Sequence, residues 1–134
     1  MTKRSVLSLL AGVSMLFALL PFAAASAAPA SDVFFSEYIE GSGYNKALEI
    51  YNGTNGTIDL STYSIDLYSN ANTSPNASVT LVGSVAAGDT FVIVLDDSRI
   101  DPALLALADQ ESNAINANGD DTYVLRNGST NVDS

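Results

Sequence analysis

The sequence of 134 residues contains no cysteine, no histidine and no tryptophan. Without cysteine there is no disulfide framework, so a small core has to be held together by packing alone. Without histidine and cysteine there is no thiol nucleophile, no Ser-His-Asp triad and no zinc site built from those ligands. Basic residues are also scarce, 5 against 15 acidic ones. Carboxylates, hydroxyls and amides are left for any chemistry, in a chain long enough for one domain.

The first 27 residues have the pattern of a secretory signal peptide. Lys3 and Arg4 form a basic start, residues 6–20 carry no charge, and small residues follow Pro21. The uncharged run is shorter than the roughly 20 residues of a bilayer-spanning helix. We therefore predict cleavage after Ala27, a secreted protein of residues 28–134, and no membrane span after cleavage.

The predicted secreted part is strongly acidic. It keeps 3 of the 5 basic residues and all 15 acidic residues, which gives a formal charge of −12. Such a surface repels phosphate backbones and anionic lipids. We expect no direct binding of nucleic acid by this part alone, and we interpret the acidity as an aid to solubility.

The hydrophobic pattern predicts an all-β protein with one short helix. Strands are expected at residues 33–40, 47–52, 57–60, 63–68, 77–82, 90–95 and 122–126, separated by turns rich in Gly and Asn. In the first strand, simple alternation places Phe35, Glu37 and Ile39 on one face. Residues 91–95 have no polar interruption and predict a central strand buried on both faces. Asp101 as N-cap and Pro102 at the first position predict a helix of about eight residues. An antiparallel sandwich or barrel fits this pattern.

The carboxyl end of the sequence looks incomplete. Residues 131–134 resemble the beginning of another strand, and the sequence stops there. We expect that the domain of residues 28–134 is truncated at its last strand.

Several segments, taken in order, resemble the lamin tail domain family. They are FSEYIEGS at residues 35–42, NKALEIYNG at 45–53, IDLSTYSI at 58–65 and AGDTFVI at 87–93. No single segment is specific, but the ordered set is, and the resemblance extends from Asp32 to Ser134.

The resemblance implies an immunoglobulin-like antiparallel β-sandwich and a non-enzymatic role. In secreted bacterial members, this domain is often an N-terminal module ahead of an extracellular nuclease. The implied function is that of a secreted binding or targeting module with an unidentified extracellular ligand, no required cofactor and a catalytic domain downstream in the parent protein.

Glu37 and Glu49 raise an alternative from the enzyme class. A pair of carboxylates about 5–10 Å apart across a cleft is the arrangement of a glycosidase. The structural interpretation is that these glutamates accept hydrogen bonds from loop N–H groups or pair with Lys46. We favour it, because the chain offers no partner base or nucleophile.

Two further acidic clusters raise the alternative of a calcium-dependent adhesion domain. Asp96, Asp97 and Asp101 follow the buried strand, and Asp120 and Asp121 lie in a Gly-containing loop. Loop carboxylates are suitable ligands for calcium, although neither spacing matches an EF-hand. Asp120 and Asp121 are the candidate metal ligands, whereas Asp101 is expected to cap the helix.

The sequence also predicts the positions of two polar side chains, one exposed and one capping a strand. Tyr44, in a loop with two glycines, is the tyrosine expected to be exposed. Asn52 is expected to cap the end of its strand through its side-chain amide.

Overall fold

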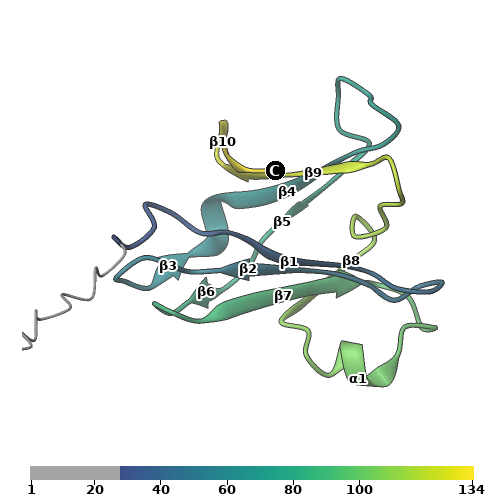
Figure 1. Ribbon diagram of the computed structural model, residues 1–134, viewed down its shortest axis with the longest axis horizontal. Helices are drawn as coiled ribbons and strands as arrows, with labels where there is room; N and C mark the ends of the chain where they lie inside the picture. The colour runs from purple at the N-terminus through teal and green to yellow at the C-terminus, as the bar shows by residue number, and fades with distance from the viewer. Residues whose placement is uncertain (1–27) are drawn as a thin grey trace, which may run out of the picture.

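The computed structural model describes residues 28–134. The predicted signal peptide and its cleavage position at Ala27 lie outside the described residues. Two four-stranded sheets pack face to face (Figure 1). The first sheet has the order β1 (Phe34–Glu40), β2 (Lys46–Tyr51), β7 (Thr90–Leu95) and β8 (Gln110–Ser112). The second has the order β10 (Thr130–Asp133), β9 (Thr122–Asn127), β4 (Tyr63–Tyr68) and β5 (Ala77–Thr80).

Short elements close one end of the sandwich. β3 (Ile58–Asp59) pairs with β6 (Ser84–Val85), and the 3₁₀ turn η1 (Leu60–Thr62) leads directly into β4. Asp59 caps η1 by accepting a hydrogen bond from the Ser61 N–H at 2.9 Å. The architecture is the predicted immunoglobulin-like β-sandwich.

The structure corrects the predicted strands and helix. β6 and β8 were not predicted, and β8 pairs with β7 in parallel, so the first sheet is not purely antiparallel. The helix α1 (Pro102–Leu105) has four residues instead of about eight. Asp101 caps it as expected, accepting from the Ala103 N–H at 2.8 Å. The segment that contains α1 connects the end of β7 to the start of β8. Because this connection crosses back over the face of the sheet, β8 runs in the same direction as β7.

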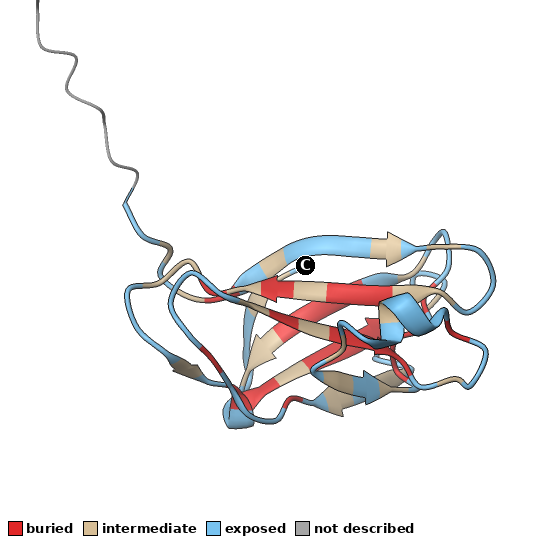
Figure 2. Ribbon diagram, turned by 90° about the horizontal axis from the view of Figure 1, so that it is seen from below, coloured by how far each residue is buried: buried red, intermediate tan, exposed pale blue. Residues whose placement is uncertain are grey.

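The main core lies between the two sheets. The alternating residues Ile65 and Leu67 of β4 face Ile50 and Ile93 of the first sheet, and all are buried. Figure 2 shows this buried layer in red along the central strands and pale blue on the loops and α1. β7 is buried along most of its length, as its uninterrupted apolar run predicts.

A second, smaller core lies on the outer face of the first sheet. Ala47 and Val94 are covered there by Ile100, with Leu104 and Ala108 packed beside them. The segment around α1 therefore shields part of a sheet face that alternation alone would leave to solvent. No helix in residues 28–134 has the length and apolar character needed to cross a membrane.

Candidate functional site

An open groove lies between β1 and β9, at the edge of the sandwich. It has a volume of about 270 Å³ and is lined by Phe35, Tyr38, Leu48, Asp121, Thr122, Tyr123 and Ser134. The ladder between β10 and β9 reaches only from Thr130↔Asn127 to Asp133↔Leu125. Within the described residues, Thr122–Val124 pair with Asp66–Tyr68 of β4. The groove combines apolar and aromatic side chains with a few polar groups, which is the lining typical of a ligand-binding surface.

A bulge in β1 determines which side chains reach this groove. The register between β1 and β2 shifts between Phe35 and Glu37, so Ser36 is the extra residue. Phe35 and Tyr38, three positions apart, consequently face the groove together, while Glu37 lies on the other face. The predicted alternation, which placed Phe35 with Glu37, is wrong for this reason.

Two tyrosines form one wall of the groove. The rings of Tyr38 and Tyr123 meet edge to face with centroids 6.0 Å apart. The Tyr38 hydroxyl donates to Glu40 Oε2 at 3.0 Å, and the Tyr123 hydroxyl accepts from the Ala117 N–H at 3.0 Å. Burial raises the pKa of Tyr123 to about 12. Burial and the hydrogen bond to Glu40 also raise the pKa of Tyr38. Both phenols are therefore neutral at physiological pH and present a rigid aromatic surface.

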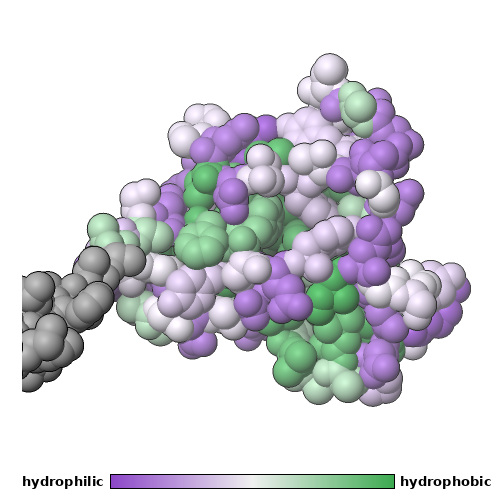
Figure 3. Space-filling model, viewed as in Figure 1, coloured by the Kyte–Doolittle hydropathy of each residue, from purple (hydrophilic) through white to green (hydrophobic). Residues whose placement is uncertain are grey.

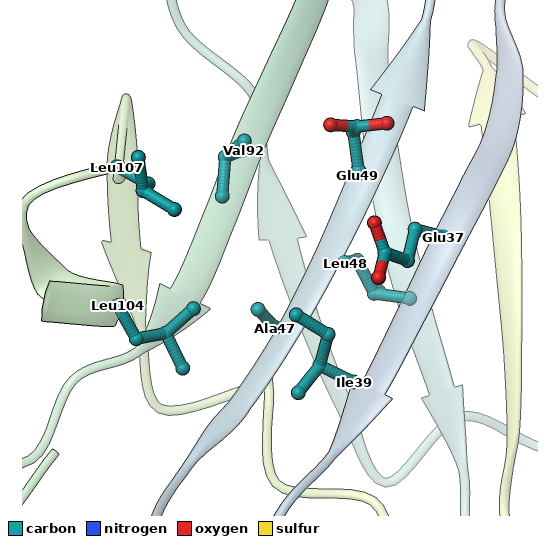
Figure 4. A pocket seen from close by; sticks show the side chains of 8 residues that line it. All are labelled: Glu37, Ile39, Ala47, Leu48, Glu49, Val92, Leu104 and Leu107. Atoms are coloured by element: carbon teal, nitrogen blue, oxygen red, sulfur yellow. The ribbon is translucent and has the colours of Figure 1, made fainter. Parts of the chain in front are cut away.

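Glu37 and Glu49 lie directly opposite each other on β1 and β2. They face the outside of the first sheet, above a shallow hollow of about 60 Å³ whose other walls are apolar (Figure 4). Pairing with Lys46, one of the two structural roles expected for them, is wrong, because the Lys46 ammonium lies 3.7 Å from Glu40 and donates to the Ala117 carbonyl. The carboxylates stand side by side on adjacent strands and not on two sides of a cleft, so the geometry of a glycosidase is not met.

In the first acidic cluster, the loop after β7, Asp97 has a structural partner. Asp97 makes a two-pronged ion pair with Arg99, with a closest distance of 2.7 Å. Hydrogen bonds from the Arg99 guanidinium and N–H lower the pKa of Asp97 to about 2. The Arg99 guanidinium in turn stacks on the Tyr44 ring, 3.5 Å from its centroid. Tyr44 is exposed, as predicted.

The second acidic loop holds the two candidate calcium ligands. Asp121 Oδ1 accepts from the Asn70 N–H and Oδ2 from the Asn118 N–H, both at 3.0 Å. Asp120 is exposed. Within residues 28–134, no three acidic side chains gather in a way that could hold a metal ion. The loop geometry assigns Asp121 to joining two loops, and calcium binding by the pair stays a prediction.

Sequence analysis missed both concave surfaces. The groove depends on the bulge at Ser36, which has no sequence signal. The hollow depends on Leu104 and Leu107 reaching the outer face of the first sheet beside Val92, which no local pattern shows.

The fold defines the class of the protein as an immunoglobulin-like β-sandwich domain with two short surface concavities. A comparison with protein families matches the Lamin Tail Domain over residues 26–134. The chain belongs to the lamin tail domain family, as its ordered segments predicted. A comparison with curated proteins gave no significant match.

Proposed function

We propose that this chain is an exported, non-catalytic module that binds its ligand through the groove between β1 and β9. The observation that carries the proposal is the open groove itself, in which Phe35, Tyr38 and Tyr123 line one concave surface beside β9. An extended segment placed there would insert alternate side chains between Phe35 and Tyr123. Its ligand is accordingly an extended polypeptide with alternating apolar and polar residues.

The distribution of polar contacts supports a role without catalysis. Asp66, the one buried charged residue among residues 28–134, is paired with Arg126. Asp97 is paired with Arg99, and the carboxylates of Asp101 and Asp121 accept backbone hydrogen bonds. Each of these four carboxylates contributes to holding the fold together, and the sequence contains no histidine or cysteine that could act with a carboxylate as base or nucleophile.

We further propose that the module works beside a catalytic domain in a larger extracellular protein of the nuclease type. The family membership supports this role, and so does the absence of histidine, because the chemistry of a nuclease would then reside in another domain. The export step rests on the signal pattern of residues 1–27. Secretion of the full chain followed by amino-terminal sequencing tests it, and Ala28 is the expected first residue.

The binding function is tested with a library of random decapeptides displayed on phage and selected on the purified chain. We expect the enriched peptides to alternate apolar and polar residues and to shift the NMR signals of Phe35, Tyr38 and Tyr123, which line the groove. Tyr38→Ala should abolish selection. Val82→Ala is the matched control, since Val82 is 60% exposed and does not line the groove. Peptides without alternation, or binding that survives Tyr38→Ala, would overturn the assignment of the groove.

The non-catalytic role is tested separately. The purified chain should hydrolyse neither DNA, RNA nor phosphodiester model substrates in magnesium, manganese or calcium. Metal-dependent turnover that remains after further purification would show that the chain is an enzyme.

A further inference from the structure

The opposition of Glu37 and Glu49 is electrostatically unfavourable as it stands. The two residues are direct cross-strand partners, and like charges in that position destabilise a sheet. Ser36 Oγ donates to Glu49 Oε1 at 2.7 Å, which satisfies one oxygen but adds no positive charge. Within the described residues, neither glutamate takes part in an ion pair.

The described part of the chain has no cation left to neutralise this pair. Each of its three basic side chains already contacts an acidic one, in the pairs Lys46 with Glu40, Arg99 with Asp97, and Arg126 with Asp66. The other two basic residues, Lys3 and Arg4, belong to the predicted signal peptide. Within the described residues, the pair is therefore free to accept a positive charge from another molecule.

The surface next to the two carboxylates is apolar. Ile39, Ala47, Val92, Leu104 and Leu107 form the other walls of the hollow, together with Leu48 (Figure 4). Figure 3 shows strongly hydrophobic surface in green beside α1, bordered by hydrophilic residues in purple. The hollow, about 60 Å³, exceeds the roughly 10–15 Å³ needed by one water and suits a single aliphatic side chain.

This combination selects an aliphatic cation over a metal ion. A calcium ion needs six to eight oxygen ligands, whereas two carboxylates on apolar walls supply too few. A lysine side chain matches both parts of the site, because its methylene stem packs on apolar surface while its ammonium group stays at the polar rim. Hydrogen bonds between an ammonium and carboxylates are strengthened by their charges.

We propose that the hollow on the outer face of β1 and β2 is a docking site for a lysine side chain of a partner protein. The stem lies against Val92 and Leu107, and the ammonium group is held by Glu37 and Glu49. The site lies on the opposite face of β1 from the groove, so a failure of the groove assignment leaves this proposal standing, and the reverse is also true.

The test is an NMR titration of the purified, isotope-labelled chain with the tripeptide acetyl-Leu-Lys-Leu-amide. We expect saturable shifts centred on the amides of Glu37, Glu49 and Val92. The matched ligand acetyl-Leu-norleucine-Leu-amide keeps the stem and lacks the charge, and it should bind about tenfold more weakly. The double variant Glu37→Gln with Glu49→Gln should lose the same factor for the lysine peptide.

Asp120→Asn is the matched control for Glu37→Gln. Each variant removes one exposed carboxylate, but Asp120 lies in the loop before β9 and does not line the hollow. Equal weakening by Asp120→Asn and Glu37→Gln would show long-range attraction without a site. Equal binding of the lysine and norleucine peptides, shifts elsewhere, or stronger shifts of these amides with calcium chloride would also overturn the proposal.

Discussion

The side-chain amide of Asn52 donates a hydrogen bond to the carbonyl of Val85 at 2.9 Å and joins segments 33 residues apart. The same amide group donates to Gly56, and Asn52 Oδ1 accepts from the N–H and hydroxyl of Thr54. Asn52 is completely buried. It therefore organises the whole turn after β2 and attaches it to β6, which extends the capping role predicted from the sequence.

Asn52→Ala is expected to destabilise the fold by about 2–3 kcal/mol. The substitution removes the hydrogen bonds from Asn52 to Val85 and Gly56 and those it accepts from Thr54, and so releases the turn. Urea unfolding followed by circular dichroism measures the loss. Asn55→Ala, at an exposed position of the same turn, should change the stability by less than about 0.5 kcal/mol. Similar effects of the two variants would show that Asn52 does not organise the turn.

Stability should fall at alkaline pH because of buried tyrosines. Burial raises the pKa of Tyr123 from 10.0 to about 12 in the folded chain. A group whose pKa is raised by folding contributes its full stabilisation below the unfolded value and loses it as pH rises through the folded value. The urea midpoint should therefore decline between about pH 10 and 12.

Tyr123→Phe should flatten this decline, because the variant removes one of the titrating groups. Tyr63→Phe should act in the same direction, since burial and a hydrogen bond to Asp32 raise the pKa of Tyr63 to about 12. At neutral pH, Tyr123→Phe should cost about 1 kcal/mol, because the Ala117 N–H loses its acceptor. An unchanged pH slope in both variants would contradict the assignment of the alkaline transition to these phenols.

Asp121→Ala is expected to destabilise the chain by about 1–2 kcal/mol in the absence of calcium. Its carboxylate accepts from the backbone of Asn70 and Asn118, and so ties the loop after β4 to the loop before β9. Asp120→Ala should have little effect under the same conditions. Thermal melts with a chelator and with calcium chloride measure both variants.

These melts also test the predicted calcium site. A calcium-dependent rise in Tm that disappears in Asp120→Ala and in Asp121→Ala would establish the pair as metal ligands. A rise that is equal in the parent and in Asp120→Ala would assign the effect of calcium to other carboxylates.

Local patterns were sufficient for most of the fold but not for its irregular parts. The strands with alternating or continuous apolar residues, such as β4 and β7, were predicted because burial imposes that pattern. β8 was missed because Gln110, Glu111 and Ser112 are all polar, so no apolar pattern marks them as a strand. The prediction of which face of β1 carries Phe35 was wrong, because the sequence pattern gives no signal for the bulge at Ser36.

The candidate surfaces required tertiary information. Glu37 and Glu49 were recognised as a pair, yet their direct opposition depends on the register of β1 and β2. The hollow below them depends on α1 folding back over the outer sheet face, which brings Leu104 and Leu107 next to Val92. Residues this far apart in sequence share no local periodicity, so no pattern along the chain could reveal the surface.

Glu37→Gln is expected to stabilise the free chain by about 0.5 kcal/mol. The substitution removes one of two like charges on adjacent strands and disturbs no hydrogen bond of the Glu37 side chain. The gain should shrink in high salt, which screens exposed charges. Urea unfolding at low and high ionic strength measures it, with Asp120→Asn as the control for overall charge. If Glu37→Gln stabilises the fold but weakens lysine binding, the function of Glu37 is to bind the partner and not to stabilise the sheet. A loss of stability would show that Glu37 supports the sheet.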